Sequence, residues 1–182
     1  MKYFLLALAL FLQTIGYAQD KGPVEVTPVV KKKLKQEIEQ QVPAFKKGLE
    51  AAQESKAAIE FAVDTFRIER LTGKWMDLDY SDYGMNSANY EAARLYDSLM
   101  NKYYKKLLAV LKGDDKKVLV QAQKAWLAFR DSETKLIGML GKDEYSGGGT
   151  IQRLESSSAY LALIERRTLE LFHHYERISN SD

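Results

Sequence analysis

Apolar residues recur every three or four positions over most of the chain, which is the spacing of one face of an α-helix. No stretch alternates polar and apolar residues in the way of a half-buried β-strand. The pattern predicts five helices, over 29–41, 44–71, 89–111, 115–140 and 151–178. Helices joined by short connections predict an all-α fold, a small bundle of four to five helices.

Helix-breaking residues set the expected ends of these helices. Pro43 is expected to end the first helix and Gly73 the second, since both residues disfavour a helix interior. Asp114 is expected to cap the start of the fourth helix. Three consecutive glycines before the last helix predict a flexible loop. The polar and aromatic stretch 74–90 is expected to be a loop whose carboxylates cap helices.

This stretch also contains Asp77, Asp79 and Asp82, which invite comparison with a calcium loop. An EF-hand loop carries Gly at its sixth position and Glu at its twelfth. Counted from Asp77, these positions hold Asp82 and Ala88 instead. The spacing therefore predicts no metal site here.

The first 18 residues have the layout of a secretory signal peptide. One lysine precedes the apolar run 3–12, and the small residues Gly16 and Ala18 follow it. Cleavage is expected after Ala18, which predicts an exported protein, either periplasmic or secreted. The alternative is an uncleaved anchor, but the run is short for a membrane span of about 20 residues.

Composition narrows the function classes further. A chain of 182 residues that is 46% hydrophobic and 29% charged suits a globular domain with a modest core. A net charge of +2 lacks the basic footprint of a nucleic-acid-binding protein. The only histidines, His173 and His174, point about 100° apart on a helix and are poor joint ligands. The sequence therefore predicts no enzyme, no metal and no cofactor.

The fourth helix carries charges beside a tryptophan. Trp126, Arg130 and Glu133 share one helix face, so Arg130 is expected over the Trp126 ring and paired with Glu133. Asp131 is expected to point toward a neighbouring helix. The structural interpretation is a charged cluster that fixes helix register. The functional alternatives are a recognition surface or a carboxylate acid–base pair.

These residues form part of a longer set of motifs. The elements D-x-x-L-N-x-x-Y, A-Q-x-A-W-x-x-F/Y-R-D-x-E, G-G-[ST] and R-T-x-x-L all find counterparts, with Met100 in place of the first leucine. Together they resemble the lysozyme inhibitor LprI-like family of small exported bacterial proteins. The resemblance covers about 85–175. The motif positions expected to form a structural cluster are Asp97, Asn101, Tyr104, Trp126, Arg130, Asp131 and Glu133.

The resemblance implies three segments and a binding role. The signal peptide spans 1–18, an N-terminal helical extension 19–84, and the LprI-like helical domain 85–178. The resemblance also implies that the protein inhibits a lysozyme (muramidase) without catalysis or cofactor. The alternative is a structural or partner-binding envelope module without inhibitory activity. Cysteines common in the family are absent here; their places hold Ala88, Thr134 and one of 157–159.

The loop before the last helix is the candidate inhibitory segment. Lysozymes cleave glycosidic bonds with two carboxyl groups in a cleft. A protruding loop with hydroxyl or cationic groups can plug such a cleft, and the candidates here are Tyr145, Ser146, Thr150 and Arg153. The alternatives are an ordinary helix connection at this loop and a contact with a basic enzyme surface through the acidic, aromatic segment 77–83.

Overall fold

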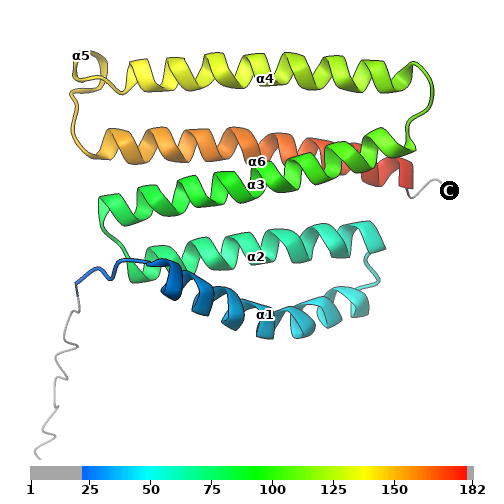
Figure 1. Ribbon diagram of the computed structural model, residues 1–182, viewed down its shortest axis with the longest axis horizontal. Coiled ribbons are helices and arrows are strands. Elements are labelled where there is room, and N and C mark those ends of the chain that lie inside the picture. Colours follow the sequence, from blue (N-terminus) through cyan, green and yellow to red (C-terminus); the bar gives the residue numbers. More distant parts are fainter. Residues whose placement is uncertain (1–21, 180–182) are drawn as a thin grey trace, which may run out of the picture.

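The computed structural model describes residues 22–179, so the predicted signal peptide lies outside the described residues. Within this range the chain forms helices and connections without a β-strand, which confirms the all-α prediction (Figure 1). The helices are α1 (Pro28–Ala51), α2 (Lys56–Leu78), α3 (Asp82–Val110), α4 (Asp115–Leu140), α5 (Asp143–Ser146) and α6 (Ile151–Ser179). None of them is long and apolar enough to cross a membrane.

The long helices lie side by side in an array rather than in sequence order. α1 packs on α2, α2 on α3, and α3 on α6, while α4 packs on the far side of α6 (Figure 1). The last helix of the chain therefore lies between α3 and α4. The short helix α5 lies at one end of the molecule, where the chain turns from α4 into α6.

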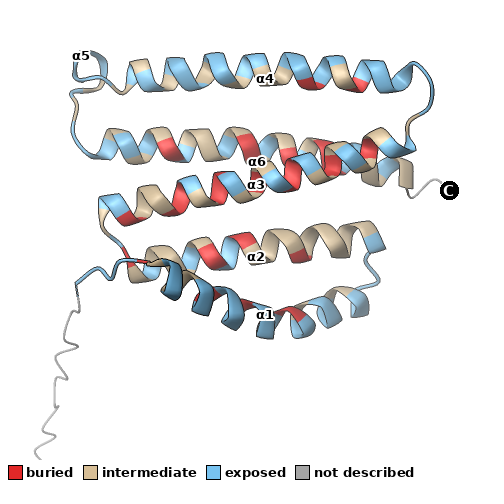
Figure 2. Ribbon diagram, in the orientation of Figure 1, coloured by how far each residue is buried: buried red, intermediate tan, exposed pale blue. Residues whose placement is uncertain are grey.

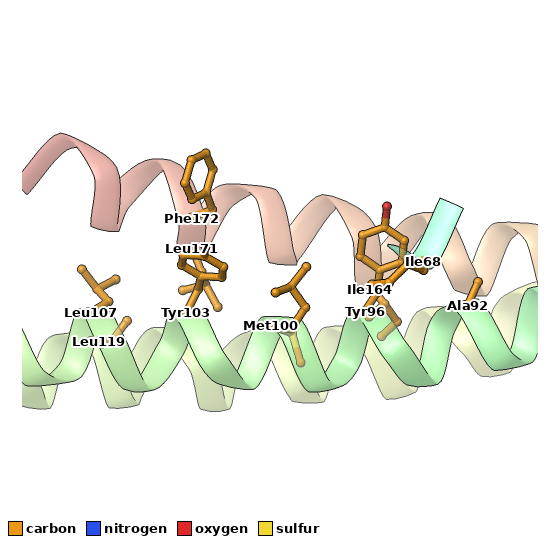
Figure 3. Packing of buried hydrophobic residues seen from close by; sticks show 11 residues of the cluster. Ile68, Ala92, Tyr96, Met100, Tyr103, Leu107, Leu119, Ile164, Leu171 and Phe172 are labelled. Carbon is orange, nitrogen blue, oxygen red and sulfur yellow. The ribbon is translucent and has the colours of Figure 1, made fainter. Parts of the chain in front are cut away.

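The main core fills the contact between α3 and α6. Tyr103 and Met100 of α3 and Leu171 and Ile164 of α6 are fully buried and point toward one another (Figure 3). Phe61 of α2 stacks on Phe172 of α6 with ring centroids 4.0 Å apart, which joins α2 to the same core. Figure 2 shows the buried residues gathered on the inner faces of these helices, whereas α4 is largely exposed.

The prediction that Pro43 ends the first helix is wrong, because α1 continues through it to Ala51. Pro43 is exposed, so the backbone carbonyl that lost its partner faces water. On the opposite side Leu34, Ile38 and Val42 are buried, and this packing carries the helix past the proline. Figure 1 shows α1 as a curved helix.

The expected second helix, 44–71, is also placed wrongly. Its first part belongs to α1, and α2 begins after Ser55, whose hydroxyl accepts a hydrogen bond from the Ala58 N–H at 3.0 Å. Gly73 does not end α2, which continues to Leu78. Leu71 and Leu78, on either side of the glycine, pack in a second core cluster, so burial outweighs the glycine's low helix propensity.

The stretch 74–90 is not the loop that its polarity predicts. Three residues, 79–81, connect α2 to α3. Ser81 caps α3 by accepting a hydrogen bond from the Gly84 N–H at 3.0 Å, and it donates to Asp79 Oδ1 at 2.6 Å. A Cβ at Gly84 would lie 2.1 Å from Asp79 Cγ, so this connection requires glycine.

The other boundaries follow the sequence more closely. α4 has the predicted bounds, α6 ends one residue later than expected, and α3 begins seven residues earlier at Asp82. Asp114 does not cap α4: its backbone is helical and its side chain makes no capping hydrogen bond. The expected glycine loop contains one helical turn, α5, before the three glycines.

Candidate functional site

α4 is held by few contacts, and most of them are with α6. Within α4, Leu119 and Gln123 are the buried residues. Trp126, one turn further on, is partly buried against the main core. Gln123 and Trp126 of the motif A-Q-x-A-W therefore lie on the packed side of α4, whereas its two alanines, Ala122 and Ala125, are exposed.

Two arginines from different helices lie over the Trp126 ring. The guanidinium of Arg130, one turn further along α4, is 5.7 Å from the ring centroid, as the sequence predicts. The guanidinium of Arg167, on α6, is 5.9 Å from the same ring. Each contact of this kind stabilises by roughly 0.5–2 kcal/mol, depending on desolvation. We call these three residues the Trp126 cluster; it joins α4 to α6.

Gln123 extends this connection to a third helix. Its amide Nε2 lies 3.7 Å from the sulfur of Met100 on α3. Its amide oxygen accepts a hydrogen bond from Arg167 Nε at 3.0 Å, and Arg167 Nη1 contacts Glu170 at 3.1 Å. Both Gln123 and Arg167 stand in the motifs quoted above, yet the residues alone did not reveal their roles, because their contact depends on which helix packs beside α4.

Two of the predicted pairings in α4 are wrong. Arg130 pairs with Asp131, not Glu133, through Nε at 2.9 Å and Nη2 at 2.6 Å to the same Oδ1. Asp131 does not point toward a neighbouring helix; its side chain is 60% exposed. Glu133 is partly buried.

The remaining motif residues belong to α3. Asn101 donates through Nδ2 to the Asp97 carbonyl at 2.9 Å and to its carboxylate at 3.1 Å. This pair is one helical turn apart and makes these bonds within α3. Tyr104 packs against the main core. The seven residues expected to form one cluster thus lie on two helices, three on α3 and four on α4, and the hydrogen bonds between Asp97 and Asn101 stay within α3.

The candidate inhibitory segment forms the end of the molecule at α5, which we call the α5 tip (residues 142–153). Tyr145 is 57% exposed there. Ser146 is engaged in the turn: its hydroxyl donates to the Lys142 carbonyl at 3.0 Å and accepts from the Gly148 N–H at 3.2 Å. Gly148 has φ +74°, and a Cβ on it would lie 2.2 Å from Asp143 Oδ1.

Thr150 and Arg153 line a hollow beside the α5 tip, of about 570 Å³. Its other walls come from Asn86 and Tyr90 on α3 and from Gly138 near the end of α4. Tyr145 and Ser146 are not among its lining residues. The four candidate residues therefore form two pairs, one on the α5 turn and one at the hollow.

A second hollow between α2 and α6 contains two carboxylates, Glu69 and Glu165. Burial raises the pKa of Glu165, and the negative charge of Glu69 raises it further. The Tyr96 hydroxyl donates to Glu69 Oε1 at 3.3 Å, and burial, followed by these two carboxylates, raises the pKa of Tyr96. The excess of negative charge in this hollow disfavours ionisation of both the Glu165 carboxyl group and the Tyr96 hydroxyl group.

The protein is a small all-helical bundle in which the motif residues Gln123, Trp126 and Arg167 connect α3, α4 and α6. The family described as "Lysozyme inhibitor LprI" matches residues 77–171, which run from the end of α2 through most of α6. The chain belongs to this family. Searches of curated proteins and of solved structures found no match.

Proposed function

We propose that the exported chain, residues 19–182, binds and inhibits a lysozyme. The observation that carries this proposal is the family match, which spans α3, α4, the α5 tip and most of α6. The role requires export, because lysozymes act on the cell envelope; the signal-peptide pattern at 1–18 supports a periplasmic or secreted location.

The α5 tip is the part of the surface that best fits a lysozyme cleft. It lies at the end of the array where α4 turns into α6 (Figure 1), and it presents the exposed ring of Tyr145 and the exposed cation Arg153. A guanidinium forms strong, bidentate hydrogen bonds with a carboxylate. In this proposal Arg153 pairs with a catalytic carboxylate of the enzyme, and Tyr145 occupies part of the sugar-binding cleft.

The test is a titration of the mature chain into a panel of lysozymes of different classes, with peptidoglycan turnover as the measurement. At least one enzyme should be inhibited stoichiometrically. Tyr145→Ala and Arg153→Met should each weaken inhibition by about tenfold or more, the size of a central interface residue. Arg166→Met, which removes an exposed arginine from the middle of α6, is the matched control and should inhibit as well as the wild type.

Tyr83→Ala separates this contact from the acidic, aromatic segment 77–83, since Tyr83 is the most exposed tyrosine there. Loss of inhibition in this variant alone would move the contact surface to that segment. Undiminished turnover of every lysozyme at excess protein would leave the alternative function, a structural or partner-binding module.

A further inference from the structure

α4 has a second apolar stripe that faces away from α6. Val118 and Leu119 are adjacent, so their side chains point about 100° apart; Leu119 is buried and Val118 is not. The large apolar residues of the outward stripe are between 43% and 69% exposed, namely Val118, Phe129, Leu136 and Leu140. Ala122 and Ala125 lie between them and are exposed as well. No other helix in the described range 22–179 covers this stripe.

The stripe has the spacing of a helix that packs on another helix. Positions 118, 122, 125, 129, 132 and 136 are separated alternately by four and three residues. This is the repeat of the a and d positions of a coiled coil, where a side chain of one helix fills a hole on its partner. A surface helix of a globular domain needs one such face, which α4 already uses against α6. The outward face is a second one.

We propose that a second copy of this chain packs on the outward stripe, with the two α4 helices antiparallel. In an antiparallel pair each a position lies opposite a d position of the other helix. One register then places Phe129 opposite Ala125 of the second copy. The same register places Val118 opposite Leu136 and Ala122 opposite Ser132 of the second copy.

Side-chain size favours this register over a parallel pairing. Phe129, the largest side chain of the stripe, meets the smallest, and the two-fold axis repeats this contact twice. A parallel pair in register would instead place Phe129 against Phe129 and Ala122 against Ala122. In the parallel pair, two phenylalanines would crowd one layer of the interface and two alanines would leave a gap in another. Crowding and gaps both destabilise packing.

The size of the stripe predicts a weak dimer. From Val118 to Leu140 it is ~33 Å long, and a helix is about 10 Å wide. Two facing stripes of this size cover roughly 700 Å², which is below the standard size of a specific interface and fits a weak, transient dimer. The dimer is therefore expected to form only toward the upper end of the concentration range tested below. The α5 tips lie at opposite ends of such a dimer, so neither is covered.

The experiment is sedimentation velocity of the mature chain, residues 19–182, from about 1 μM to 1 mM. The wild type should change from monomer to dimer across this range. Phe129→Glu combined with Leu136→Glu should raise the dissociation constant at least ~100-fold, because it places four carboxylates in the interface. Both residues are exposed, and glutamate is a good helix former, so circular dichroism should be unchanged.

The matched control is Leu169→Glu, which changes a leucine of α6 that is as exposed as Leu136. It should dimerise like the wild type. A wild type that stays monomeric at 1 mM, or a dimer that survives the double substitution, would overturn the proposal. If the wild type is monomeric and the double substitution abolishes lysozyme inhibition, the stripe binds the lysozyme instead. That result would also overturn the proposal.

Cross-linking tests the register, since the chain has no cysteine of its own. A mixture of Ala122→Cys and Ser132→Cys chains should form a disulfide-linked heterodimer on mild oxidation. Ala122→Cys alone should not, because ten residues, or ~15 Å, separate the two cysteines in the antiparallel register. Efficient self-linking of Ala122→Cys would indicate a parallel pair and contradict the proposal. Sedimentation and cross-linking use no lysozyme, so their outcomes stand apart from the proposed function.

Discussion

Replacing Trp126 with alanine should detach α4 without unfolding the rest of the molecule. α4 contributes two buried residues to the structure, and the Trp126 cluster is its main further link to α6. The core between α3 and α6 does not depend on α4 for most of its buried residues. Loss of Trp126 is therefore expected to open one edge of the array.

The size of the effect follows from burial and from the two arginines. Truncating a fully buried tryptophan costs about 3–5 kcal/mol, and partial burial of Trp126 reduces this to roughly half. The two cation–π contacts are partly exposed and add about 0.5–1 kcal/mol each. The expected loss is therefore about 3 kcal/mol, a large part of the free energy that keeps α4 docked.

Hydrogen exchange of backbone amides, followed by mass spectrometry, measures this loss helix by helix. Peptides from α4 should exchange about 100-fold faster in Trp126→Ala, the factor that corresponds to about 3 kcal/mol. Peptides from the middle of α3 and from α2 should change little. Trp75→Ala is the matched control: it removes the other tryptophan, from the core cluster of α1 and α2, and should speed exchange there instead. Equal acceleration in all helices, or none in α4, would show that Trp126 does not hold α4 as a separate unit.

Three further outcomes are expected. Glu165→Gln should be more stable than the wild type at neutral pH and equally stable near pH 3. The pKa of Glu165 is raised in the folded protein, so the wild type loses stability as the pH rises through that pKa. Urea unfolding at both pH values measures the difference. Glu60→Gln should show the opposite trend. Burial opposes ionisation of Glu60, but hydrogen bonds from Lys102 and Lys106 lower its pKa on balance, so its stabilisation is present at neutral pH and lost in acid. Gly148→Ala should disturb the α5 turn and reduce lysozyme inhibition, whereas Gly113→Ala, also at positive φ but in open space, should not.

The parts of the fold that the sequence predicts correctly are those with strong local signals. α4 and α6 have long helical periodicity and are bounded by glycine-containing turns, so their ends could be located. Pro43 and Gly73 misled the prediction because their effect on a helix depends on what surrounds it. Both residues are exposed, and buried apolar neighbours on the opposite face hold the helix together. A single sequence does not reveal that burial.

The same distinction applies to the site. The contact between Trp126 and Arg130 follows from helix geometry, since residues four apart share a face. The contact with Arg167 requires knowing that α6 lies beside α4, and periodicity carries no such information. The pairing of Arg130 with Asp131 was missed because adjacent residues point about 100° apart, yet the long arginine side chain spans that angle.

A double-mutant cycle measures whether the Trp126 cluster joins α4 to α6. Trp126→Leu, Arg167→Met and the double variant would be compared with the wild type by urea unfolding. A coupling free energy of about 0.5–1 kcal/mol is expected between the two sites. Additive effects of the two substitutions, with no coupling, would show that Arg167 does not hold α4 through the Trp126 ring.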